Sequence, residues 1–105
     1  MSHANLKSEI LDRTPPRDLD AERWVAGSII LRPTVFEDVR AICAAGDFID
    51  IGCRAVFEAA ERIGARGEAI DVGTVRLEMK AVGDFDEVRA EFLGALLQGV
   101  PTAAH

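Results

Sequence analysis

Apolar residues recur every three or four positions along most of this chain, and residues that start or stop helices separate these stretches. An aspartate before such a stretch can accept a hydrogen bond from a free amide at a helix N-terminus. The candidates for this role are Asp18, Asp50, Asp71 and Asp86. Alternation of apolar and polar residues, as strands require, is nearly absent, and tyrosine is missing. The sequence therefore predicts an all-α fold, a compact bundle of about five helices.

Prolines and glycines set the expected bounds of these helices, because proline resists the helix interior and glycine favours the residue just past its end. Gly64 and Gly67 are expected to close the third helix, and Pro101 to stop the last. The helices are expected over 18–31, 33–46, 50–64, 71–83 and 86–100.

Pro15 and Pro16 mark the start of the helical domain, which is expected to cover residues 15–105. Residues 1–14 are polar and unpatterned, which predicts a flexible N-terminal arm. Leu6, Ile10 and Leu11 leave one alternative open, a short helical turn packed against the domain.

The helix expected over 71–83 has a narrow apolar seam. Val72, Val75, Met79 and Val82 step along it by three, four and three residues. The acidic residues of this helix and the next are placed on their polar faces, and these are Glu78, Glu87 and Glu91.

The helix expected over 50–64 has a charged face opposite its apolar one. This face carries Arg54, Glu58, Arg62 and Arg66. Glu58 lies four residues before Arg62, a favourable pairing that usually contributes a few tenths of a kcal/mol. The pattern predicts a solvated surface.

A chain of 105 residues has room for one domain with one core. Its 18 acidic and 12 basic residues give a net charge of −6, which repels phosphate and argues against strong DNA binding by this domain alone. A helix-turn-helix DNA-binding protein is an alternative that suits the helices but not this charge. No run approaches the roughly 20 apolar residues that span a bilayer, and no signal peptide opens the chain, so no membrane contact and a cytoplasmic location are expected.

The residues that could carry chemistry are few. His3 and His105 lie at the chain termini, and Ser28 falls on an apolar helix face, where its hydroxyl is expected to bond back to a helix carbonyl. Neither Lys7 nor Lys80 follows the glycines of a phosphate-binding GxxxxGK[ST] loop. We therefore predict no catalytic, cofactor-binding or metal-binding residues in this chain.

The cysteines and aromatic residues are interpreted as core. Cys43 and Cys53 have no CxxC or Cys/His spacing, so they are expected to be small buried apolar residues. Trp24 and the phenylalanines lie on or beside apolar stripes and not within basic clusters, which favours core packing over base stacking.

Several motifs in register give the chain a family resemblance. From about Pro15 onward it resembles the N-terminal domain of bacterial replicative DNA helicases of the DnaB family. Similar segments are Pro15-Pro16 with Asp20-Ala21-Glu22 and Val25-Ala26-Gly27, Asp47-Phe48 with Val56-Phe57, Gly67 with Ile70-Asp71-Val72 and Thr74-Val75, and Pro101-Thr102-Ala103-Ala104. The chain departs from the family at Arg32, where a capping Asp is common, and at Cys53, the usual histidine position. One residue is also missing between Val88 and Leu93.

The resemblance implies a function in protein contact. Members of the family form hexameric rings in which these domains make a collar, bind primase and pair partly through a helical hairpin that follows the matched region. ATP and Mg are expected only in the motor domain, which this chain lacks, so no catalytic residue transfers to it. Primase, possibly a helicase loader, and further copies of the chain are the expected partners, with contact residues unknown. A free-standing adaptor or inhibitor that mimics the collar is the alternative.

Overall fold

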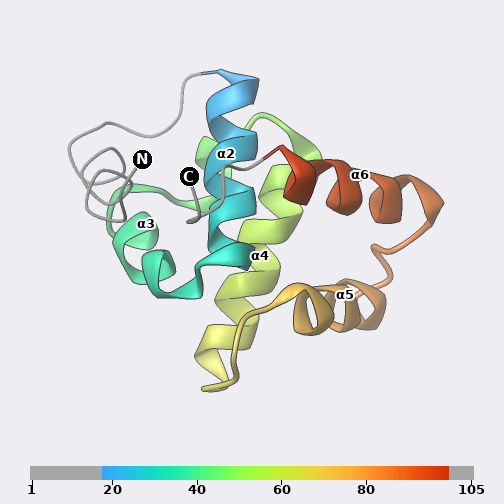
Figure 1. Ribbon diagram of the computed structural model, residues 1–105. Helices are drawn as coiled ribbons and strands as arrows, with labels where there is room; N and C mark the ends of the chain where they lie inside the picture. Colours follow the sequence, from blue (N-terminus) through green and yellow to red (C-terminus); the bar gives the residue numbers. More distant parts are fainter. Residues whose placement is uncertain (1–17, 100–105) are drawn as a thin grey trace.

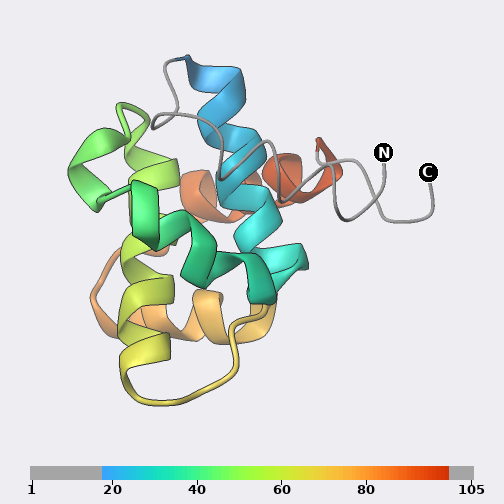
Figure 2. The ribbon, with the colours of Figure 1, turned by 90° about the vertical axis from the view of Figure 1, so that its left-hand side faces the viewer.

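The computed structural model describes residues 18–99, and within them every regular element is a helix. The all-α class predicted from the sequence is confirmed. The α-helices are α2 (Leu19–Leu31), α3 (Phe36–Ile42), α4 (Ile51–Ala65), α5 (Val72–Ala81) and α6 (Glu87–Gln98), with short 3-10 turns η1 (Pro33–Val35) and η2 (Ala45–Asp47). Helices α2 and α4 lie in the middle, α3 covers one side of this pair, and α5 and α6 cover the other (Figure 1, Figure 2). The predicted arm over 1–14 lies outside the described residues.

The four predicted N-caps are confirmed. Each aspartate side chain accepts a hydrogen bond from a backbone amide in the first turn of its helix, at distances between 2.7 and 3.2 Å. Each such cap contributes about 1 kcal/mol of stability. The caps begin α2, α4, α5 and α6 at Asp18, Asp50, Asp71 and Asp86.

The helix predicted over 33–46 is shorter and broken. It starts as the 3-10 turn η1, because Arg32 provides no side-chain cap, and α3 ends at Ile42. Cys43 and Ala44 are extended, and the Asp47 carboxylate accepts a hydrogen bond from the Ala44 amide at 2.7 Å. This local bond replaces the helical one, so the predicted stop at Gly46 is wrong.

Two glycines end helices in the left-handed conformation that favours glycine. Gly67 has φ 73° after α4, and Gly83 has φ 76° after α5. In each case the next amide reaches back to a helix carbonyl, from Glu68 to Ile63 at 3.1 Å and from Asp84 to Met79 at 2.8 Å. The predicted stops at these two glycines are confirmed. Helix α6 ends at Gln98, and the predicted continuation to Val100 and Pro101 lies outside the described residues.

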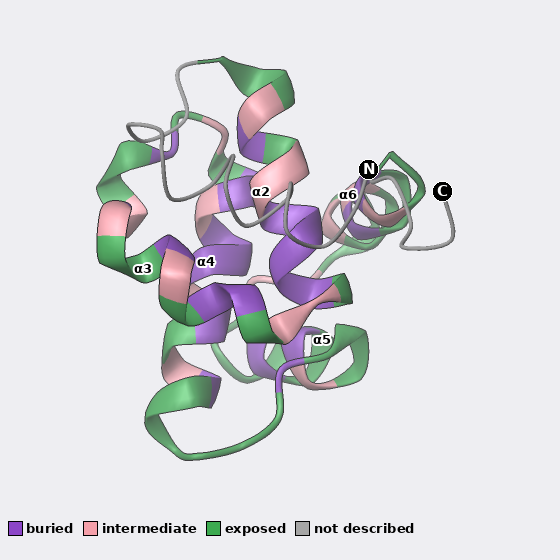
Figure 3. Ribbon diagram, turned by 60° about the vertical axis from the view of Figure 1, so that its left-hand side comes forward, coloured by how far each residue is buried: buried purple, intermediate pink, exposed green. Residues whose placement is uncertain are grey.

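The core lies where α2 and α4 face each other, with α3 and α5 closing it (Figure 3). Phe57 is fully buried at its centre, with ring centroids 5.4 Å from Phe36 and 5.3 Å from Phe48. Cys43 and Cys53 are buried, as the sequence predicted. The Ser28 hydroxyl donates to the Trp24 carbonyl at 2.7 Å, so it bonds back to the helix as expected.

The apolar seam predicted for α5 is only half correct. Val75 and Met79 are buried, whereas Val72 and Val82 are exposed. Val88, near the start of α6, is 74% exposed. These exposed residues lie toward helix ends, beyond the part of each helix that the central pair covers.

Close packing of α6 on α4 depends on Gly52. A Cβ atom at this position would lie 2.6 Å from the tip of the Phe92 ring, too close for real contacts. We expect Gly52→Ala to destabilise the domain by about 1–3 kcal/mol through overpacking. Gly46→Ala is the matched control, because a Cβ there meets nothing within 4 Å. Urea unfolding of both variants checks this, and equal midpoints would refute the packing role of Gly52.

Candidate functional site

The described residues hold little that could perform chemistry. Within 18–99, no group of three or more His, Cys, Asp or Glu is placed to hold a metal ion. Burial raises the pKa of the Cys53 thiol to about 12 and that of Cys43 to about 11, which disfavours the reactive thiolate. His3 and His105 lie outside the described residues. What the structure offers is therefore a surface, together with the polar contacts that hold its helices in place.

Glu22 links the two central helices. Its side chain is fully buried, and its carboxylate accepts hydrogen bonds from the backbone amides of Ile49 at 2.9 Å and Asp50 at 2.8 Å. These amides precede α4, whose N-terminus carries partial positive charge that favours a carboxylate. Nearby, Arg23 forms an ion pair with Asp50 at 3.7 Å.

Sequence reasoning missed the role of Glu22. It used this residue only as part of a motif, although Glu22 lies four and seven residues before Ala26 and Ile29, which are buried on the same helix face. That position was the available signal. A carboxylate on a buried face must find hydrogen-bond donors, and here the start of α4 supplies them.

A second buried acid corrects the prediction of a solvated face on α4. Glu78 of α5 is 8% exposed, and its two carboxylate oxygens accept from Arg62 and Arg66, each at 2.7 Å. Arg62 is therefore paired across helices, and among the described ion pairs none joins it to Glu58. Arg54 donates to the Phe48 carbonyl at 2.8 Å. Three of the four charged residues on this face thus connect α4 to neighbouring segments.

The pair of guanidinium groups makes stability depend on pH. Hydrogen bonds from Arg66 and then Arg62 lower the pKa of the Glu78 carboxyl in the folded protein below the ordinary value of about 4.3. The contribution of the ionised Glu78 carboxylate to folding stability is therefore fully present above a pH of about 4.3. It is lost as the pH falls through the lowered pKa.

We expect Glu78→Gln to reduce the melting temperature most near neutral pH, because glutamine keeps the shape but loses the charge. The gap between the two proteins should close as the pH falls below about 4. Melting curves followed by circular dichroism between acid and neutral pH measure this gap. A gap that stays constant over the whole range would contradict the assignment.

Large apolar side chains are exposed on the described surface, each between 40% and 74%. Ile49 and Ile51 flank the cap of α4. Others lie on α5, at its C-terminal end and near the start of α6. The full set is Leu19, Leu31, Ile49, Ile51, Val72, Leu77, Val82 and Val88. Such exposed apolar side chains offer surface that a protein partner could cover.

Phe85 and Phe92 pack against the core, as predicted, and each also has cationic groups beside its ring. The Phe85 ring has the charged groups of Arg76 and Lys80 at 5.5 and 5.4 Å from its centroid. The Phe92 ring likewise has Arg23 at 5.2 Å and Arg89 at 5.9 Å. Both rings are only partly buried, unlike Phe36, Phe48 and Phe57. The Arg23–Phe92 contact joins α2 to α6, so helical periodicity within one segment does not reveal it.

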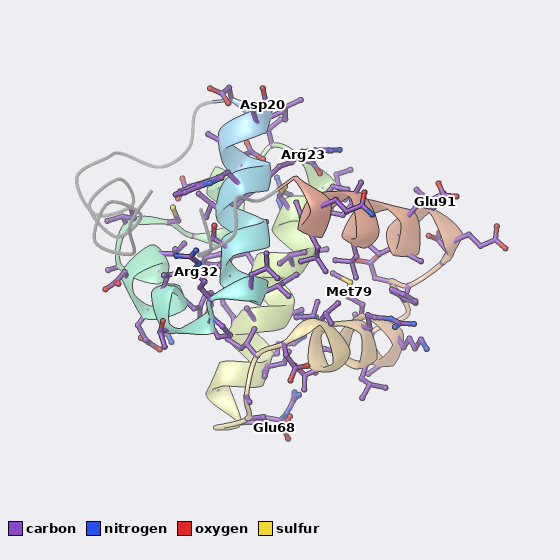
Figure 4. All side chains as sticks on the ribbon, viewed as in Figure 1. Asp20, Arg23, Arg32, Glu68, Met79 and Glu91 are labelled. Carbon is purple, nitrogen blue, oxygen red and sulfur yellow. The ribbon has the colours of Figure 1, made fainter. Side chains whose placement is uncertain are left out.

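Two grooves run beside α6. The first lies between α2 and α6, where Figure 4 shows Asp20 at the start of α2 and Arg23 facing α6. The second, here named the α5–α6 groove, lies between the last two helices. It is lined by Val72, Arg76, Phe85, Ala90, Leu93, Gly94 and Leu97. Grooves of this kind suit the docking of a partner helix.

No helix within the described residues has the length and apolar character needed to cross a membrane.

Comparisons with known proteins agree on one family. Residues 14–105 match the family described as DnaB-like helicase N terminal domain. The replicative DNA helicase DnaB of Geobacillus stearothermophilus is 33% identical over 95 residues, which cover 90% of this chain and 21% of that protein. The DnaB helicase of Mycobacterium leprae is 35% identical over 99 residues, 93% of this chain and 16% of that protein. The chain therefore spans about a fifth of the length of these relatives.

A solved structure gives the same answer. The crystal structure of the N-terminal domain of DnaB helicase from Mycobacterium tuberculosis matches with a TM-score of 0.75 and 34% identity, covering 87% of this chain and 67% of that one. The helical fold, the sequence identity and the family match thus coincide over nearly the same residues. The chain belongs to the family of DnaB-like helicase N-terminal domains.

Proposed function

We propose that this domain acts in DNA replication as the N-terminal collar of a replicative helicase, where it self-associates and binds primase or a helicase loader. Catalysis is not part of its task. ATP and Mg would be bound by the motor domain of the parent protein, in the part of the relatives that this chain does not span. Membership of the family supports a function in DNA replication, and the exposed apolar surface of the domain supports protein binding.

The observation that carries the proposal is the exposed apolar surface. Side chains such as Ile49, Ile51, Leu77 and Val88 are each at least 66% exposed, although 20 apolar residues within 18–99 are buried in the core. Keeping large apolar groups in water forgoes roughly 25 cal/mol for each Å² that a partner could cover. The net charge of −6 makes DNA an unsuitable ligand for the domain alone. A protein partner is compatible with both the exposed apolar side chains and the negative net charge.

Primase binding is tested by calorimetric titration of the cognate primase's C-terminal domain into this chain. The proposal expects saturable binding. A second titration uses a version extended through the helical hairpin that the family resemblance implies, so that a binding surface formed only in the paired assembly is also tested. Absence of heat of binding in both titrations would contradict primase docking.

Self-association is tested separately by light scattering over a concentration series. The proposal expects the mass of the hairpin-extended version to rise with concentration toward a dimer or a larger ring. A mass that stays monomeric at every concentration in both versions would contradict the assembly role while leaving primase docking untouched.

A further inference from the structure

The α5–α6 groove has an apolar floor with helical spacing. Ala90, Leu93, Gly94 and Leu97 lie at positions i, i+3, i+4 and i+7 of α6, so they share one helix face. Val72 and Phe85 line the groove from the side of α5, and the volume of this open groove is about 280 Å³. This volume suits one or two apolar side chains of an inserted segment.

The floor is open at Gly94. A Cβ atom built at this position meets nothing within 4 Å, although the residue lies in the middle of α6. Glycine in a helix interior costs about 1 kcal/mol relative to alanine. No packing contact inside the domain requires the missing side chain. The vacancy is therefore available to a side chain from outside.

The charges beside the groove are basic. Arg76 lines it, and Lys80 lies one helical turn further along α5, with both cationic groups over the Phe85 ring. Within residues 18–99 neither forms an ion pair, whereas Arg62, Arg66 and Arg89 do. The net charge of the chain is −6, yet two cations without an acidic partner lie beside this apolar groove. The groove therefore favours an apolar ligand that carries negative charge.

We propose that the α5–α6 groove binds an acidic amphipathic helix of a partner protein, with apolar side chains along one face and Asp or Glu beside them. This inference rests on the proposed docking function and names the chemistry of one partner segment. Apolar anchors would enter at Gly94 and Leu97, and carboxylates would meet Arg76 and Lys80. A second copy of this chain fits less well, since pairing one groove with another around a twofold axis would bring their cations together.

The test uses a fluorescein-labelled helical peptide with leucines at i, i+3, i+4 and i+7 and glutamates at the other positions. Fluorescence anisotropy measures its binding to the whole 105-residue chain. Two control peptides carry lysine in place of glutamate, or alanine in place of leucine. The proposal expects saturable binding of the acidic leucine peptide, weakened by salt, and binding of the controls that is weaker by at least about tenfold.

Variants of the chain locate the contact. Gly94→Leu fills the groove and should abolish binding without lowering the melting temperature, because its Cβ meets no neighbour and leucine favours helix. Gly46→Leu is the matched control at a second open glycine. Arg76→Glu combined with Lys80→Glu should weaken binding by roughly tenfold or more, whereas Arg40→Glu on α3 should not.

The possible results separate this inference from the proposed function. If primase binds the chain but the acidic peptide does not, or if the lysine peptide binds equally well, the groove proposal is overturned and the docking function stands. If the acidic peptide binds and Gly94→Leu abolishes binding, the proposal is supported even where primase titration fails. If the chain instead dimerises and Gly94→Leu removes the dimer without any peptide binding, a second copy is the occupant and the proposal is wrong.

Discussion

Substituting alanine for Glu22 is expected to lower the free energy of unfolding by about 3 kcal/mol, because it leaves the backbone amides of Ile49 and Asp50 without their acceptor. The carboxylate is fully buried and accepts from Ile49 and Asp50 across 27 and 28 residues of sequence. Urea denaturation followed by circular dichroism measures the loss.

Two further variants make this result specific to Glu22. Glu22→Gln keeps one oxygen acceptor and loses the charge, so a smaller loss of about 2 kcal/mol is expected. Glu37→Ala removes an acid from α3 that is 79% exposed and pairs with Arg40 at 3.4 Å, so a change below about 0.5 kcal/mol is expected. If all three variants unfold at the same urea concentration as the parent chain, the link between α2 and α4 carries no stability.

Truncating Phe57 to alanine is expected to cost about 3–5 kcal/mol, the typical range for deleting a buried aromatic side chain. Phe57 is fully buried between Phe36 of α3 and Phe48 before α4, so its ring joins three segments. The cavity left behind would loosen both contacts at once. A variant that fails to give a cooperative unfolding transition would agree with this expectation.

Val88→Ala is the surface control for that experiment, since its side chain is 74% exposed and its loss should change stability by no more than about 0.5 kcal/mol. The pair is compared by thermal and urea unfolding. Equal stability of Phe57→Ala and Val88→Ala would mean that the aromatic cluster does not organise the core.

The helix starts were predictable because each depends on local chemistry. Asp50 and Asp71 cap helices through amides two or three residues away, and a sequence displays that spacing directly. Gly67 and Gly83 could likewise be placed, because a helix end in the left-handed conformation strongly favours glycine. The all-α class follows from these signals and the apolar period together.

The contacts between helices were not predictable in the same way. Glu22 reaches Ile49, and Glu78 is held by Arg62 and Arg66, and each of these pairs is separated by at least 12 residues. Periodicity places a side chain on a face, but it does not say which other helix covers that face. For the same reason Val72 was expected in a seam and is exposed beside a groove instead.

The sequence indicated a binding surface only because it offered no residues for catalysis. Sequence reasoning found no catalytic residues and left the contact residues unknown. The cations around Phe85 and the open floor at Gly94 become visible only when α5 and α6 are placed together. Their position beside one groove has no signature within a single helix.

Nuclear magnetic resonance can test directly whether this domain works by binding proteins. The chain is labelled with ¹⁵N and titrated with the cognate primase's C-terminal domain while every resolved amide signal is followed. We expect saturable shifts that gather on surface residues of a contiguous patch and leave buried core amides such as that of Phe57 nearly unchanged. Signals that stay unchanged throughout the titration, in this chain and in the hairpin-extended version, would contradict it.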